Sequence, residues 1–148
     1  MSELPPLLRD QRKIDADHLK LLAIFHFVGA GLAGLGILFL FAHYAMMQVF
    51  FANPEMWQGK HGEGPPPGFF DLFKWFYLVF GLWLVVSTGL NVISGLWIRA
   101  RKHRTFSLVV AGLNCVNMPL GTGLGVFTIV VLVRSSVREL YEHEQPQP

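Results

Sequence analysis

Charged side chains are scarce in this chain and are absent from two long stretches. Asp, Glu, Lys and Arg make up 15% of the 148 residues, against roughly a quarter in an average soluble domain. None of them occurs from Leu21 to Phe41 or from Tyr77 to Ile98, and each stretch matches the ~20 residues that a helix needs to cross a bilayer. A buried helix of a soluble protein rarely lacks a polar face over such a length. The composition therefore excludes an ordinary soluble domain and predicts an integral membrane protein.

Other features that the sequence lacks exclude several classes of protein. The single cysteine, Cys115, excludes an intramolecular disulfide. The first apolar run begins late and has no A-x-A cleavage site at its end, so we expect a permanent span rather than a cleaved signal peptide. No Asp, Glu, Lys or Arg is expected at mid-membrane depth, which weighs against a proton-coupled pump. No pattern resembles a nucleophile with its base, so we expect no enzyme, no cofactor and no nucleic-acid partner.

The expected fold is all-α: a polytopic membrane protein with a four-helix transmembrane bundle that ends in a short C-terminal helical hairpin. A cytoplasmic leader at 1–17, which could include an interfacial helix, precedes a transmembrane domain at 18–141 and a disordered tail at 142–148. The four helices are expected at about 18–52, 70–98, 105–118 and 122–140, with an external loop at 53–69. Asp15 or Asp17 is expected to cap the first of them.

The last two helices are separated because Pro119 lies in the middle of the final apolar stretch, with Gly121, Gly123 and Gly125 after it. Proline removes a backbone donor and glycine weakens a helix, so a break is expected there. The third helix is then only about 20 Å long, which leaves open whether the hairpin crosses the bilayer or re-enters it.

The distribution of basic residues predicts the orientation. With a break at Pro119, ten of the twelve Lys and Arg residues fall on one side, leaving Lys60 and Lys74 on the other. The positive-inside rule then places both termini in the cytoplasm. A single long final helix would carry Arg134 and Arg138 outside, so the charge pattern favours four helices.

Small and amide side chains recur at helical spacing and are the candidates for helix packing or for lining a pore. They are Ser87, Asn91, Gly95, Asn114, Asn117, Pro119, Gly121 and Gly125. Small residues let helix backbones approach closely in lipid, and amides form hydrogen bonds between helices there. Packing within one chain is the plainest interpretation. Contacts between copies are the alternative. His26, two turns in from the cytoplasmic end of the first span, is a candidate titrating group.

One set of residues has the chemistry of a Cu(I) site: His43, Met46, Met47, Cys115 and Met118. Imidazole, thioether and thiolate together suit this soft ion. Methionine in an apolar segment is more often a filler of space, which is the alternative interpretation.

The C-terminal half carries a recognisable run, from Pro119 to Thr128, which reads PLGTGLGVFT. It resembles the Pro-x-Gly-Thr-x-Leu-Gly-Val-Phe-Thr signature of an uncharacterised family of bacterial four-span inner-membrane proteins. His26 and His43 on the first helix, together with the Asp17-His18-Leu19 triplet, are similar to the front of that family. The resemblance implies a four-helix topology in the bacterial inner membrane and no particular activity. Ser135 stands where a proline is expected after Arg134, so the last helix is expected to continue straight into the tail.

These observations favour a non-catalytic protein that acts through helix–helix contacts, either with itself as a homo-oligomer or as an accessory subunit of a larger membrane complex. An oligomeric channel or carrier for a small solute, lined by the asparagines, is the alternative from a different class. Outward-facing Cu(I) binding is a third possibility.

Overall fold

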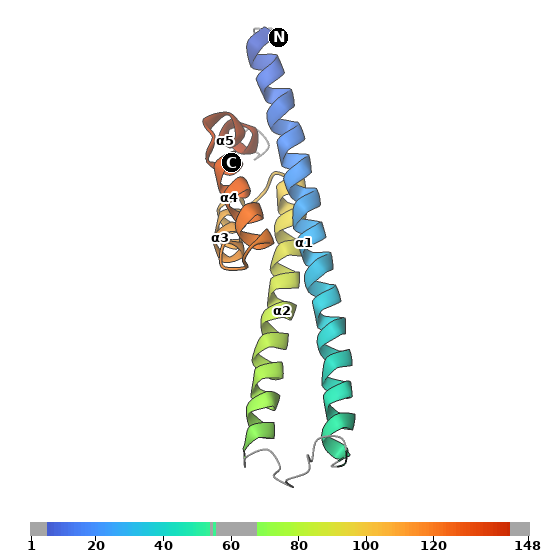
Figure 1. Ribbon diagram of the computed structural model, residues 1–148. Helices are drawn as coiled ribbons and strands as arrows, with labels where there is room; N and C mark the ends of the chain where they lie inside the picture. The colour runs from blue at the N-terminus through green and yellow to red at the C-terminus, as the bar shows by residue number, and fades with distance from the viewer. Residues whose placement is uncertain (1–5, 54, 56–67, 143–148) are drawn as a thin grey trace. The chain divides into compact units, whose positions relative to one another are not determined.

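The computed structural model of this chain describes residues 6–53, 55 and 68–142. Its regular elements are five helices, labelled in Figure 1. They are α1 (Pro6–Ala52), α2 (Phe69–Arg99), α3 (Arg104–Asn114), α4 (Leu120–Val133) and α5 (Ser135–Glu142). The all-α prediction is therefore confirmed for the described residues. Most of the predicted external loop and all of the predicted tail beyond residue 142 lie outside them.

Two of these helices are long and apolar enough to cross a membrane. The qualifying segments are Asp10–Ala52 in α1, with 43 residues, and Asp71–Arg99 in α2, with 29 residues. The pair α4 and α5 would count as a third only if it is taken as one span bent by 72°. By length and composition the described residues thus hold two or three candidate spans.

The predicted leader is not a separate element where it is described. Helix α1 begins at Pro6. Proline suits the first turn of a helix, because the N–H groups there have no carbonyl partner within the helix and proline, which lacks an N–H, therefore loses no hydrogen bond. No proline or glycine interrupts the chain from Leu7 to Val28, so the helix continues into the apolar segment. Asp15 and Asp17 consequently lie inside a helix and do not cap one, which corrects the expectation from the sequence.

The chain divides into two compact units, each described here by itself. Among the described residues, those up to 30 and those from 89 onward form what we call the bundle unit, and those between 31 and 88 form the stem unit. Helices α3, α4 and α5 belong entirely to the bundle unit, whereas α1 and α2 contribute segments to both.

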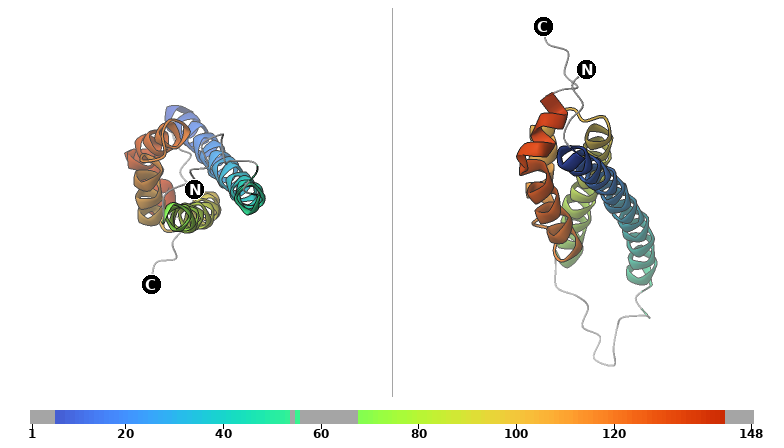
Figure 2. Two further views of the ribbon diagram at one scale, coloured as in Figure 1. Left: turned by 60° about the horizontal axis from the view of Figure 1, so that its bottom comes forward. Right: turned by 90° about the horizontal axis from the view of Figure 1, so that it is seen from above.

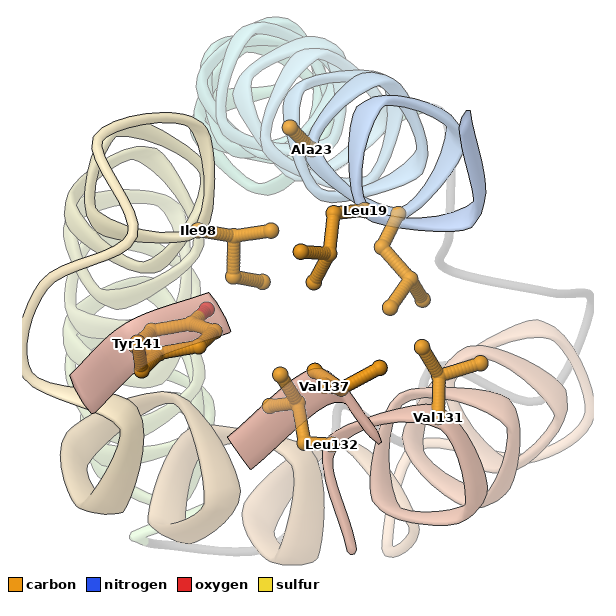
Figure 3. Close-up of a cluster of buried hydrophobic side chains, with 8 residues drawn as sticks. Leu19, Ala23, Ile98, Val131, Leu132, Val137 and Tyr141 are labelled. Carbon is orange, nitrogen blue, oxygen red and sulfur yellow. The ribbon is translucent and has the colours of Figure 1, made fainter. Parts of the chain in front are cut away.

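The bundle unit has its own apolar core, shown in Figure 3. Its buried members are Leu19, Leu22, Ala23, Ile98, Val131, Leu132, Val137 and Tyr141. The α1 members repeat at helical spacing, so they share the face of α1 that meets the other helices. Leu22, Ile98 and Leu132 are completely buried, and full burial of such a side chain stabilises the folded state by about 1.5–3 kcal/mol.

Helices α3 and α4 form an antiparallel hairpin whose arms lie side by side in Figures 1 and 2. Glycine permits this close approach. A Cβ added at Gly125 would collide with the carbonyl oxygen of Ala111 and with the sulfur of Cys115, and one at Gly121 would collide with the carbonyl oxygen of Asn114. In the first turn of α4 the Thr122 hydroxyl donates to the Cys115 carbonyl at 2.8 Å, which satisfies an acceptor that the end of α3 leaves free.

The expected straight run from the last helix into the tail is wrong. Helix α4 ends at Val133, and α5 leaves it at an angle of 72°. Arg134 adopts an extended backbone with ψ 137° at this point. The bend turns Val137 and Tyr141 of α5 into the core of the bundle unit (Figure 3). Burial of this apolar face outweighs continuation of the helix, because α5 is amphipathic and would otherwise leave both side chains in solvent.

The hairpin provides a test of packing with a matched control. We expect Gly125→Ala to lower the melting temperature of the detergent-purified protein, because overpacking costs about 1–3 kcal/mol. Gly123→Ala lies two residues away on the same helix, with nothing described within 4 Å of its added Cβ. It should leave the melting temperature unchanged or raise it, since alanine favours a helix by about 1 kcal/mol over glycine. Equal effects of the two changes would contradict the close approach.

Candidate functional site

The centre of the bundle unit holds a buried polar network to which four helices contribute one side chain each. They are His26 of α1, Asn91 of α2, Asn114 of α3 and Thr128 of α4. Their exposed fractions are 0%, 5%, 4% and 0%. Polar groups this deep in an apolar interior are costly unless they form hydrogen bonds.

Two asparagines form the middle of the network. The Asn114 amide donates to Asn91 Oδ1 at 2.8 Å, and the Asn91 amide donates back to Asn114 Oδ1 at 3.1 Å. His26 Nδ1 lies 3.0 Å from the same Asn91 oxygen. With the amides oriented in this way, Nδ1 carries a proton and donates it. A joint half-turn of both amides would preserve the Asn–Asn pair and let Nδ1 accept instead.

Thr128 closes the network on the other side of the imidazole ring. Its hydroxyl donates to the Leu124 carbonyl at 2.7 Å and lies 3.3 Å from His26 Nε2. A hydroxyl has one proton, so while it bonds Leu124 it can only accept from Nε2–H. When it turns toward a bare Nε2, it gives up the Leu124 carbonyl. By rotating, this one hydroxyl can bond Nε2 whether or not that nitrogen carries a proton. Both ring nitrogens of His26 therefore have a partner.

Small residues make the approach of the helices possible. An added Cβ at Gly95 would lie 3.1 Å from the ring of Phe27 and 3.3 Å from the Ala23 carbonyl oxygen. One at Gly29 would make only ordinary van der Waals contacts, 3.6 Å from Leu124 and 3.9 Å from Asn91 Oδ1, so Gly95 is the position at which the close approach needs a glycine. The backbones of α1 and α2 can thus come close enough within the bundle unit for His26 to reach Asn91.

A second polar cluster joins α1 to the bend between α4 and α5. The Asp15 carboxylate is completely buried, and its Oδ1 lies 3.6 Å from Arg134 Nη1. Gln11 donates to the same oxygen at 3.4 Å, and Arg134 Nη1 lies 3.5 Å from His18 Nδ1. A buried carboxylate needs such a cation, since an unpaired charge there costs several kcal/mol. The cluster therefore fixes the position of the bend.

Sequence reasoning missed Asp15, Arg134 and Thr128. For Asp15 a signal exists, because it lies four residues before Leu19 and seven before Leu22 on the buried stripe of α1. The sequence interpretation assigned it to a cap instead. Thr128 gives no such signal in a helix that is apolar all round.

The predicted copper ligands are divided between the two units. In the stem unit, His43 Nδ1 forms a hydrogen bond with the Tyr77 hydroxyl, and the exposed fraction of Met46 is 56%. Met47 lines a groove of the same unit. Cys115 and Met118 belong to the bundle unit, where 83% of Met118 is exposed. Among the described residues no three His, Cys, Asp or Glu side chains gather as metal ligands. The copper set stays a prediction.

The remaining predicted residues lie outside the network that the structure shows. Ser87 is half-buried in the stem unit. Asn117 and Pro119 lie in the loop between α3 and α4, where the Asn117 backbone donates to the Asn114 carbonyl at 2.9 Å. Of the three predicted pore-lining asparagines, the structure thus brings Asn91 and Asn114 together as a buried pair.

The fold and the network define an all-helical chain with membrane-length apolar helices that lock together through polar side chains. Comparison with protein-family models, with curated proteins and with solved structures found no match for this chain. The resemblance to the four-span family therefore stays a prediction.

The network is testable with a pair of threonines. Thr128→Val removes both the bond inside α4 and the contact with His26, and we expect it to destabilise the purified protein by about 1 kcal/mol. Thr88→Val removes only an intrahelical bond, from the hydroxyl to the Leu84 carbonyl at 2.8 Å. Its effect should stay within a few tenths of a kcal/mol. Thermal unfolding in detergent measures both, and a Thr128 variant as stable as the Thr88 variant would show that the contact with His26 has no energetic role.

Proposed function

We propose that this chain is a non-catalytic integral protein of a bacterial inner membrane that works through helix–helix contacts. It associates with itself as a homo-oligomer or serves as an accessory subunit of a larger membrane complex. The bilayer is its solvent, and other membrane helices are its partners.

The observation that carries this proposal is a pair of uncovered glycines in the stem unit. An added Cβ at Gly31 or Gly34 would meet nothing described within 4 Å, although each glycine weakens the helix by about 1 kcal/mol relative to alanine. Leu35 and Leu38 on the same helix are 62% and 66% exposed. Contact with lipid explains the exposed leucines but does not explain why glycine occurs at these positions. A second helix does explain it, because helices pack closely against glycine.

The polar interior supports a structural role rather than catalysis. Both ring nitrogens of His26 are occupied by Asn91 and Thr128, and Asp15 is held by Arg134. A catalytic acid or base needs access to a substrate, and these groups bond other side chains of the same unit instead.

The channel alternative draws less support from the geometry. Asn91 and Asn114 bond each other reciprocally in the interior of one chain, with at most 5% of either exposed. Residues that line an oligomeric path would present their amides to water or solute. Their mutual pairing favours helix locking over solute transport.

The proposed topology has four membrane-embedded helices, with both termini in the cytoplasm. Helix α3 follows the basic segment of Arg99, at the end of α2, and Arg101, and α4 leads to Arg134 and Arg138. With 11 and 14 residues, the two arms extend only about 17 and 21 Å. Local thinning of the bilayer would let their tip reach the outer face.

Met118, at the exposed tip of the hairpin, tests this topology. In a Cys115→Ala background, Met118→Cys should react with a membrane-impermeant maleimide added to intact spheroplasts, because the tip faces outward. Ser135→Cys, at the other end of the hairpin, should react only after permeabilisation. If Met118→Cys reacts only in detergent, the hairpin re-enters the membrane and the four-span topology is wrong.

Assembly is tested by native mass spectrometry of gently extracted membranes, using a C-terminal tag. We expect a defined oligomer or a heteromeric complex for the natural sequence. Gly31→Leu with Gly34→Leu should shift the population to the single chain, because two large side chains prevent close approach of helices. Ala45→Leu is the control, since Ala45 is an exposed position on the same helix.

Two results would end the proposal. One is a strictly monomeric natural chain with no co-purified partner. The other is equal dissociation by the double glycine variant and by Ala45→Leu, since any added bulk on α1 would then have the same effect.

A further inference from the structure

A basic groove lies on the bundle unit beside the start of α3. It has a volume of about 440 Å³. Its lining comes from the start of α3 and from α5, and includes His103, Arg104, Phe106, Arg138 and Glu142. The helix-contact function gives this groove no role.

Protein contacts hold both arginines of the groove. Arg104 Nε donates to the Leu132 carbonyl at 2.7 Å, near the end of α4. Arg138 Nε donates to Glu142 Oε1 at 2.8 Å. A guanidinium has five N–H donors, and each of these bonds uses one of them. Two guanidinium groups around one groove match the oxygens of a phosphate group, which arginine binds through paired hydrogen bonds.

The charge around the groove is positive in spite of Glu142. The two arginines exceed the single carboxylate by one charge. Arg99 at the end of α2, and Arg101 and Lys102 after it, directly precede the groove residues in the chain. The backbone adds to this field. Helix α3 begins at Arg104, and the residue before it, His103, has a left-handed conformation with φ 48° and forms no side-chain cap. The positive end of the helix dipole therefore faces this region.

An exposed apolar stripe adjoins the groove. On α3, Phe106 of the groove is followed after three and seven residues by Val109 and Leu113, which are 58% and 41% exposed and share its face. Trp97 packs against His103 and Phe106, with ring centroids 4.5 and 4.3 Å away. Tryptophan at the end of an apolar helix is typical of the level at which lipid headgroups lie.

We propose that this groove binds the phosphodiester headgroup of an anionic phospholipid, with an acyl chain along the stripe of Phe106, Val109 and Leu113. Two guanidinium groups above an apolar stripe match the two parts of a lipid. A free phosphate ion or a soluble nucleotide would have no use for the stripe. The inference rests on the membrane spans of the proposed function, but not on assembly with other helices.

The test uses the full-length protein in dodecyl maltoside. Dioleoyl phosphatidylglycerol is titrated in, with dioleoyl phosphatidylcholine, dioleoylglycerol and inorganic phosphate in parallel. Melting temperature and native mass spectrometry report binding and the number of lipids retained. We expect phosphatidylglycerol to raise the melting temperature saturably and to remain bound in the gas phase, whereas the other three leave the melting temperature unchanged.

Three variants locate the site. Arg138→Gln should weaken phosphatidylglycerol binding about fivefold, the effect of one cation near a lipid surface. Lys20→Gln is the matched control, because Lys20 is likewise an exposed cation paired with a carboxylate one helical turn away. It should change binding by less than about twofold, since exposed charges outside the groove are screened. Glu142→Gln should strengthen binding, because it removes the negative charge and leaves every cation in place.

Several outcomes would overturn the inference. Stabilisation by inorganic phosphate equal to that by phosphatidylglycerol would indicate a soluble ion, and an equal response to phosphatidylcholine would indicate that charge has no role. Equal losses in the Arg138 and Lys20 variants would indicate general surface attraction. Unchanged or weaker binding by Glu142→Gln would also count against the groove, even if Arg138→Gln failed to fold. Native mass spectrometry counts chains and lipids separately, so failure of assembly and failure of lipid binding remain distinguishable.

Discussion

The bundle unit depends on the buried hydrogen bonds among His26, Asn91, Asn114 and Thr128. An unsatisfied polar group in an apolar interior is costly, and each of these side chains contacts a polar partner on another helix. A slip of one helix along its neighbour would leave several groups unpaired at once. Apolar contacts alone tolerate such slips, because one leucine packs much like the next. The network therefore sets the register of four helices.

The ion pair between Asp15 and Arg134 adds a second constraint at one end of the same unit. It places the bend after α4, and the bend turns α5 across the core, where Val137 and Tyr141 are buried. Arg138 and Glu142, on the same short helix, then face the start of α3. The ion pair between the buried Asp15 carboxylate and the half-exposed Arg134 guanidinium thus links the path of the backbone to the geometry of the basic groove.

The side chains of the buried polar network in the bundle unit bond other groups of the same chain. Interactions with other molecules are therefore expected at the surfaces of the protein. The stem unit contributes an apolar surface with open glycines, suited to another helix. The bundle unit contributes a basic groove beside an apolar stripe, suited to a charged lipid. Both surfaces are meaningful only in a bilayer, where apolar exposure is not penalised and close packing drives association.

The sequence by itself determined the helical class and the membrane-length apolar segments, because the two long uncharged runs, at 21–41 and 77–98, are compatible with few other structures. It also indicated a break near Pro119, since proline cannot continue a helix, and α3 and α4 lie on either side of that residue. Only the tertiary structure decided which faces meet. Helix α4 is apolar on every side, so no periodic pattern reveals that Thr128 turns toward His26, 102 residues earlier. The bend at Arg134 likewise depends on Asp15, which is distant in sequence, so the local helix propensity around Arg134 does not predict the bend.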